Sequence, residues 1–138
     1  MGTGLVKTFF AFERPFDPAD LADCKLASNQ WEADYARQAQ HPEPRPLNLD
    51  PGYLTEAKLV LATTKDRDHR IYLRDGIYAE VTLHFQRGAW QARPWTYPEY
   101  QRTDYHVLFL RCREYLRKRN PNGHAKGYTL WLGSALGR

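Results

Sequence analysis

The most regular alternation of apolar and polar residues runs over residues 77–86, where apolar side chains take every second position. A period of two is typical of a half-buried β-strand. A shorter run, residues 70–73, precedes it. A three-residue loop over 74–76 would keep the apolar positions of both strands on one face and place Gly76 at a positive φ. The two runs therefore predict a hairpin.

The register of this hairpin decides which polar residues meet across the two strands. A slip of one residue would move the whole apolar set to the other face, so one register is preferred. Side chains that lie opposite each other in an antiparallel pair interact directly. The predicted pairs are Leu73 with Ile77, Ile71 with Ala79, Arg70 with Glu80, and Tyr72 with Tyr78.

Two segments show the 3-4 spacing of apolar residues that indicates amphipathic helices. The first opens at Asp17-Pro18, a capping acid followed by proline at the first helical position. The second begins near Thr103 or Asp104 and stops before Asn120-Pro121. Their apolar faces are Leu21, Cys24, Ser28, Trp31 and Tyr35, and Tyr105, Leu108, Phe109, Cys112 and Leu116.

The remaining segments are less regular. Residues 5–12 alternate as a strand, and a turn at Arg87-Gly88 returns the chain over residues 89–94. Residues 54–64 fit either a short helix capped by Thr55 or a strand, and we favour the helix. Residues 121–138 fit a terminal strand or a loose tail.

These elements predict one α+β domain over residues 1–120, followed by that tail or terminal strand. The domain is a mostly antiparallel sheet of about four strands, with two main helices packed on one face. A chain of 138 residues is long enough to bury roughly two-thirds of its unfolded surface.

Composition excludes several classes of protein. No apolar run reaches the ~20 residues of a membrane span, and the N-terminus lacks a secretory pattern, so we expect a soluble cytoplasmic protein without membrane partners. The two distant cysteines form no disulfide framework or zinc set. The histidines lack ligand spacing, and no P-loop or nucleophile elbow is present. No metal or cofactor is predicted.

The positive charge is concentrated at one end of the chain. Residues 102–138 hold eight Lys/Arg against two acids, and residues 1–101 hold twelve against fourteen. A basic helix of this kind suggests RNA as a partner, because phosphate neutralisation dominates such binding. The residues that would contact RNA are Arg111, Arg113, Arg117, Lys118 and Arg119, with the aromatic rings of Trp95 and Tyr97.

The predicted hairpin also creates a candidate site. Arg70 could hold an anion, with Glu80 as a base or orienting group. The hydroxyls and ammonium of Thr63-Thr64-Lys65 suit a phosphate. The candidate catalytic residues are His69 and Glu80, and the candidate ligand-binding residues are Asp50, Lys58, Thr64, Lys65, Arg70, Tyr72 and Tyr97.

Each of these features also has a purely structural interpretation. An exposed Arg–Glu pair on a solvated sheet face contributes only ~0–1 kcal/mol. Turn chemistry alone accounts for Asp50 in DPGY. The aromatic connector WTYPEY, residues 95–100, more often covers one end of a core than it stacks a ligand.

The block NLDPGYLTEAKLVLATTKDRDHRIYLRDGIYAEVTL, followed by PWTYPEY, resembles the bacterial domain-of-unknown-function family 4416. The resemblance covers about residues 1–119 and implies no established activity. Its motif letters fall on Asp50, Pro51, Gly52, Tyr53, Lys58, Thr63, Thr64, Lys65, His69, Arg70, Tyr72, Gly76, Tyr78, Glu80, Thr82, Trp95, Tyr97 and Pro98.

The resemblance also concerns the start of the chain. Members of the family carry a further N-terminal strand-helix-strand segment, whereas MGTGLVK stands here at position 1. We therefore expect a sheet edge near residues 5–12 that is open, or covered by a second copy or another partner.

Two hypotheses of function follow. The first is a site for a small anionic, phosphorylated molecule, for which we leave open whether it catalyses a reaction. The second is an RNA-associated module built on the basic helix. A structural or partner-binding role is the remaining alternative.

Overall fold

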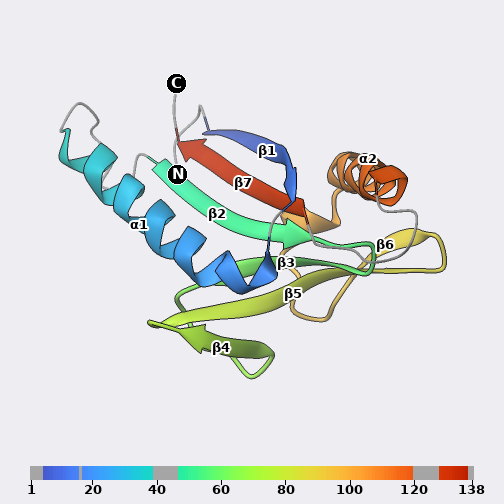
Figure 1. Ribbon diagram of the computed structural model, residues 1–138, viewed down its shortest axis with the longest axis horizontal. Coiled ribbons are helices and arrows are strands. Elements are labelled where there is room, and N and C mark those ends of the chain that lie inside the picture. The colour runs from blue at the N-terminus through green and yellow to red at the C-terminus, as the bar shows by residue number, and fades with distance from the viewer. Residues whose placement is uncertain (1–4, 16, 39–46, 120–127, 137–138) are drawn as a thin grey trace.

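The computed structural model describes residues 5–15, 17–38, 47–119 and 128–136. This part of the chain contains seven strands and two long helices (Figure 1). Every strand pair is antiparallel, which confirms the α+β class. The sheet has more than the four strands that we expected. The additional strands come from the segments predicted as a turn (residues 50–53), a helix (residues 54–64) and a tail or terminal strand (residues 121–138). The strands are β1 (Leu5–Pro15), β2 (Leu47–Leu54), β3 (Lys58–Thr63), β4 (Arg70–Arg74), β5 (Ile77–Gln86), β6 (Ala89–Ala92) and β7 (Tyr128–Leu136), and the helices are α1 (Leu21–Arg37) and α2 (Thr103–Arg119), with the short 3₁₀ helices η1 (Pro18–Asp20) and η2 (Pro98–Gln101).

The strand order is β1-β7-β2-β3-β5-β4, and β6 pairs with β5 beside this path. The C-terminal strand β7 lies between β1 and β2, so a terminal strand is the correct alternative for Tyr128–Leu136. It belongs to the same sheet as the preceding strands. Among the described strands, β1 pairs with β7 alone. It therefore lies at an edge of the described sheet.

Residues 54–64 form strand β3 and not the helix that we favoured. The hydroxyl oxygen of Thr55 accepts hydrogen bonds from the backbone N–H groups of Ala57 and Lys58, at 3.1 and 3.2 Å, and so holds a turn. After this turn β3 pairs with β2 on one side and β5 on the other. Two neighbouring strands satisfy its backbone groups, and this tertiary pairing overrides the local helical tendency.

The β4–β5 hairpin closes on a two-residue loop and not on the predicted three-residue loop. Asp75 and Gly76 both have positive φ, 51° and 78°, and Arg74 pairs with Ile77. A register shift between Tyr72 and Arg74 then restores the predicted pairing beyond the turn. Consequently Arg70 lies opposite Glu80, as the apolar pattern required.

Strand β5 carries a bulge at Thr82. Leu59 of β3 pairs with Leu83, whereas the next residue, Val60, pairs with Val81. The extra residue on β5 reverses which side chains face which side of the sheet. The alternating positions of residues 77–86 therefore do not all lie on one face, although the sequence pattern suggested that they would.

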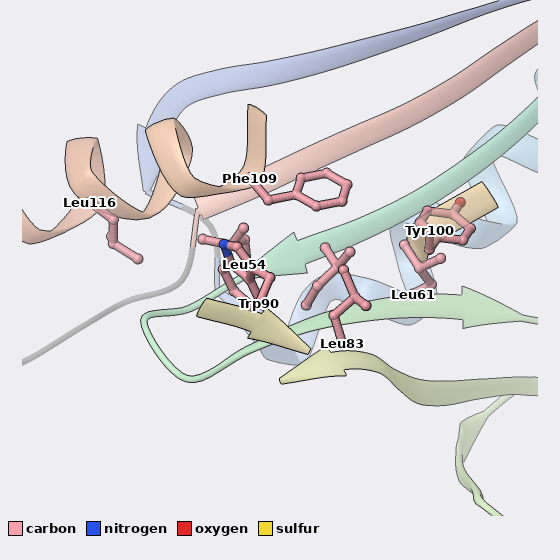
Figure 2. Close-up of a cluster of buried hydrophobic side chains, with 8 residues drawn as sticks. Leu54, Leu61, Leu83, Trp90, Tyr100, Phe109 and Leu116 are labelled. Atoms are coloured by element: carbon pink, nitrogen blue, oxygen red, sulfur yellow. The ribbon is translucent and has the colours of Figure 1, made fainter. Parts of the chain in front are cut away.

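The two helices cover opposite faces of the sheet, which corrects the expectation that both pack on one face. Leu21 and Ala22 of α1 pack with Val60, Ala62 and Ile77. On the other face, the side chains of α2 pack with alternate residues of β3 and with β6. This second cluster consists of Leu54, Leu59, Leu61, Leu83, Trp90, Tyr100, Phe109 and Leu116 (Figure 2).

Helix α1 begins as predicted but buries a different stripe. Asp17 accepts a hydrogen bond from the Ala19 backbone N–H at 3.0 Å, and the chain enters α1 through η1. Lys25 is buried, whereas Trp31, a predicted core residue, is 52% exposed. The helix is therefore rotated so that a lysine points toward the sheet. In α2 the predicted apolar face is confirmed, with Phe109 and Leu116 fully buried.

Neither described helix could cross a membrane, since both are too short or too polar for that.

Candidate functional site

Strands β2 and β3 form a fork. Their ladder has three pairs, from Gly52 with Leu61 to Leu54 with Leu59. Beyond Gly52, β2 continues along β7 while β3 continues along β5, and the two ribbons separate (Figure 1). The contact at the closed end is tight, because a Cβ at Gly52 would lie 2.4 Å from the carbonyl oxygen of Val60. Glycine is therefore required where the strands meet.

A cavity of about 310 Å³ lies at the open side of this fork. Its lining comes from helix α1, the two diverging strands, the β3–β4 loop, the β4–β5 pair and the aromatic connector. Both signs of charge and two threonine hydroxyls are present. The lining residues are Lys25, Asp50, Leu61, Ala62, Thr63, Thr64, Lys65, Arg70, Glu80, Tyr97, Glu99 and Tyr100.

Lys25 reaches this cavity from helix α1, which packs on the opposite face of the sheet. Its Nζ donates a hydrogen bond to the backbone carbonyl of Leu49 on β2, at 3.3 Å, and the residue is 7% exposed. The separation of β2 from β3 gives the side chain its route. A buried ammonium without adequate partners is costly, so the fork offers a positive group that favours an anion.

Glu80 is the centre of a buried hydrogen-bond network on the wall of the cavity. Its Oε1 accepts from Arg70 Nε at 3.0 Å and lies 2.7 Å from His69 Nε2. Its Oε2 accepts from the hydroxyl of Thr82 at 3.0 Å. The side chains of Glu80 and Arg70 are each 7% exposed, and that of His69 is 14% exposed. This carboxylate is thus oriented from both oxygens.

The bulge at Thr82 is held open by the aromatic connector. The Trp95 indole N–H donates to the carbonyl of Val81 at 2.8 Å, and the Thr96 hydroxyl donates to the carbonyl of Thr82 at 2.6 Å. These carbonyls lie between the parts of β5 that pair with β4 and with β6. Trp95 also stacks on His69, with ring centroids 4.4 Å apart. The connector therefore fixes both the bulge and the histidine that contacts Glu80.

The β3–β4 loop contributes hydroxyls and a second ammonium. The backbone N–H of Lys65 donates to the hydroxyl oxygen of Thr63 at 3.2 Å, and Arg70 Nη1 donates to the carbonyl of Lys65 at 3.0 Å. Arg70 thereby ties the loop to Glu80. The loop is held in place while the Lys65 side chain stays exposed.

Tyr97 and the helix η2 that follows it form the aromatic side of the cavity. Tyr97 is 59% exposed, and Tyr100 is buried beside Leu61, at the end of the core cluster opposite Leu116 (Figure 2). Burial raises the pKa of the Tyr100 phenol well above its usual range, and the carboxylates of Asp50 and Glu99 raise it further. The protonated phenol can donate a hydrogen bond at this wall.

Comparison with family models gives one result. The model described as "Domain of unknown function (DUF4416)" matches residues 1–115, most of the chain. The chain belongs to the DUF4416 family. The comparisons with curated proteins and with solved structures found no match. The match to the family model confirms the resemblance noted from the motif letters.

Most candidate residues of this DUF4416 chain converge on the cavity. Glu80 and five of the seven predicted ligand-binding residues line it: Asp50, Thr64, Lys65, Arg70 and Tyr97. Lys65, Arg70 and Glu80 therefore share one concavity. His69 does not line the cavity but contacts it through Glu80.

Two candidate residues of the DUF4416 chain lie elsewhere. Lys58 stands at the start of β3 opposite His84, at the closed end of the fork. Tyr72 is 56% exposed and packs against Tyr78 with ring centroids 5.2 Å apart. Neither is among the residues that line the cavity. Their roles as ligand contacts have no support in the geometry.

Sequence reasoning missed Lys25, Glu99 and Tyr100 as cavity residues. For Lys25 a signal was present, because Leu21, Lys25 and Ser28 also share helical spacing. The stripe through Trp31 obscured it, since a tryptophan is a stronger apolar signal than a serine. Glu99 and Tyr100 belong to the connector that the motif contains, but nothing local indicated which way they point.

The basic residues of α2 are not all available to a partner. Arg113 donates to the carbonyl of Glu56 at 2.8 Å and lies 3.6 Å above the Phe85 ring. Arg117 pairs with Glu56 at 3.3 Å, and Arg119 lies over Tyr115. Trp95 is stacked on His69. The surface proposed for RNA is therefore smaller than the sequence suggested, and Arg111 and Lys118 are its exposed members without such a contact in the described part of the chain.

Within the described residues, no group of three His, Cys, Asp or Glu side chains is placed to hold a metal ion.

Proposed function

We propose that this DUF4416 protein binds a small anionic molecule bearing a phosphate group in the cavity at the β2–β3 fork. Three basic side chains from three separate elements line that cavity: Lys25 from α1, Lys65 from the β3–β4 loop and Arg70 from β4. A convergence of this kind would place charge around one anion.

The single observation that carries the proposal is the buried position of Lys25. Its ammonium can donate three hydrogen bonds, and within the described chain it makes one, to the neutral carbonyl of Leu49. Charged groups that are removed from water require compensation. A phosphate in the cavity would accept the remaining hydrogen bonds and supply the opposite charge.

The rest of the network has a supporting role. Arg70 is already paired with Glu80, so it would contribute a further donor at most and mainly shape the wall. The Thr63 and Thr64 hydroxyls add donors of the size that a phosphate accepts. Glu80, oriented by His69, is the group that would act as a base if the bound molecule reacts.

A thermal-shift screen of the full chain tests this function. The probes are inorganic phosphate, pyrophosphate, sugar phosphates and nucleotides. A ligand present at 100 times its dissociation constant stabilises the folded state by about 2.7 kcal/mol, which a melting curve resolves easily. We expect at least one phosphate-bearing probe to raise the melting temperature.

Matched variants locate the binding site. Lys65→Ala should remove most of the shift, because this ammonium lines the cavity. Arg67→Ala removes the same charge two residues away, outside the lining, and should leave the shift intact. An equal shift in parent, Lys65→Ala and Lys25→Met proteins would place binding elsewhere and refute the proposal.

We also propose that the protein works in the bacterial cytoplasm. Cys24 and Cys112 are both free, as is usual for thiols in a reducing compartment. Fractionation of cells that express the tagged protein would test this, and recovery from the periplasm would contradict it.

A further inference from the structure

The charges that line the cavity are not those of a simple anion site. Besides Arg70 and Glu80, which pair with each other, the lining contains the ammonium groups of Lys25 and Lys65 and the carboxylates of Asp50 and Glu99. Inorganic phosphate would be attracted by the two lysines and repelled by the two carboxylates. An occupant that presents an anionic group to the lysines and, beside it, hydrogen-bond donors to the carboxylates would suit both pairs.

The carboxylates specify what those donors are. A carboxylate has about four acceptor positions, so Asp50 and Glu99 retain acceptor capacity whatever partner they already have. A pair of adjacent hydroxyl groups is the usual neutral partner of an acidic side chain in a nucleotide site, where the ribose hydroxyls donate to Asp or Glu. A ribose, with its cis-diol, suits this wall.

The aromatic rim specifies a third part of the ligand. Tyr97 lines the cavity and leaves 59% of its surface exposed. Its neighbours Pro98 and Glu99 begin helix η2, which fixes the backbone that carries the ring. A held but uncovered aromatic ring beside a polar cavity is a platform on which a planar base stacks.

We infer that the ligand of this cavity is a ribonucleoside monophosphate. The phosphate lies between Lys25 and Lys65, the ribose hydroxyls donate to Asp50 or Glu99, and the base stacks on Tyr97. One phosphate carries about −1.5 to −2 charges near neutral pH, which matches two lysines. The cavity, about 310 Å³, is at the small end of the range for ligand pockets, roughly 300–1,000 Å³, which also favours a monophosphate. This inference rests on the proposed function and narrows it.

Calorimetric titration of the full chain tests each part separately. The probes are the four ribonucleoside monophosphates, a 2′-deoxy counterpart, ribose 5-phosphate, a free nucleoside and inorganic phosphate. We expect one or more ribonucleotides to bind roughly tenfold tighter than ribose 5-phosphate, since stacking of one base contributes about that factor or more. The 2′-deoxy counterpart should bind roughly tenfold more weakly, because it lacks a hydrogen bond to a charged group.

Two variants assign the contacts. Tyr97→Ala should weaken the nucleotide roughly tenfold while it leaves ribose 5-phosphate unchanged. Tyr72→Ala is the matched control, because Tyr72 is 56% exposed but lies outside the lining, and it should change neither affinity. Asp50→Asn should reduce the preference for ribose over deoxyribose.

The possible failures are distinguishable. If ribose 5-phosphate or phosphate binds as tightly as every nucleotide and Tyr97→Ala changes nothing, the nucleotide class is wrong and the anion site stands. If no phosphate-bearing probe binds, both the inference and the proposed function are overturned.

Discussion

Arg70 Nε and Glu80 Oε1 lie 3.0 Å apart on adjacent strands, with both side chains almost fully buried. His69 and Thr82 complete the surroundings of the carboxylate. The Arg70–Glu80 pair lies at the open end of a short hairpin. An ion pair in such a position is usually exposed to solvent. Here Trp95 of the aromatic connector stacks on His69, which contacts Glu80, and the pair forms part of the cavity wall.

Removing the charge of Glu80 should destabilise the fold strongly. Glu80→Gln leaves the Arg70 guanidinium buried without its counter-charge, and breaking a buried pair in this way typically costs about 3–5 kcal/mol. Urea unfolding measures the change. Asp104→Asn, which breaks the exposed pair with Arg102, is the control and should change stability little. Equal effects in the two variants would show that the Arg70–Glu80 pair is solvated.

Gly52→Ala should destabilise the closed end of the fork. The new methyl group would meet the Val60 carbonyl oxygen at 2.4 Å, and forcing extra volume into a packed site costs about 1–3 kcal/mol. Gly88 differs, because it has open space around it but a φ of +77°. Gly88→Asn should therefore be tolerated, since asparagine accepts that conformation, while Gly52→Asn should not. Chemical denaturation of the three variants checks this, and a neutral Gly52→Ala would contradict the close approach.

The bulge at Thr82 predicts which face each residue of β5 occupies. Leu83 is fully buried in the cluster beneath α2, so Leu83→Ala should cost about 2–5 kcal/mol. Ile71 of β4 is 69% exposed, and Ile71→Ala should stay within about 0.5 kcal/mol. A reversed order would contradict the burial of Leu83 beneath α2.

Alkaline pH should reveal the burial of Tyr100. The pKa of its phenol lies above the ordinary value of 10.0 in the folded protein, so the folded state keeps a proton that the unfolded chain loses. The free energy of unfolding should therefore fall as pH rises past the ordinary value, and Tyr100→Phe should show a smaller fall. Unfolding in urea at about pH 8 and about pH 10.5 measures the difference between the two proteins. Identical slopes would show that the phenol is accessible to water.

RNA binding by α2, the second expectation from the sequence, needs a test that leaves the fold intact. Truncation at residue 104 would remove both a core helix and strand β7, so charge removal is the better experiment. Arg111→Gln with Lys118→Gln changes two exposed residues and spares Arg113, which packs on Phe85. If this helix binds RNA, the double variant should bind more weakly and with a salt slope reduced by about two. Unchanged binding would exclude α2 as the RNA surface.

Local pattern predicted the parts of the protein whose partners lie nearby in the chain. The Arg70–Glu80 pairing followed from the requirement that two neighbouring strands keep their apolar residues together, and it held even though the turn differs. A bulge compensated for the shorter loop, because the buried faces constrain register more strongly than the turn does. Of the six candidate site residues that line the cavity, four lie on or beside this hairpin: Thr64, Lys65, Arg70 and Glu80. Asp50 comes from β2 and Tyr97 from the aromatic connector.

The pairing of β2 with β7 could not be read from the sequence. DPGY, residues 50–53, has the composition of a turn, and residues 128–136 have no local partner. Each becomes a strand through pairing that no local pattern reveals: β2 lies between β3 and β7, and β7 lies between β1 and β2. For Lys25 the helical spacing was visible, yet its direction depends on which helical face meets the sheet.

The sequence by itself determined the class, the two helices, the hairpin register and the identity of most polar groups at the site, because periodicity and turn chemistry act within a few residues. Tertiary structure alone decided the fork, the bulge, the placement of the helices on opposite faces and the entry of Lys25. Those features depend on contacts between distant segments, and the free energy of such contacts is not encoded in the spacing of any one segment.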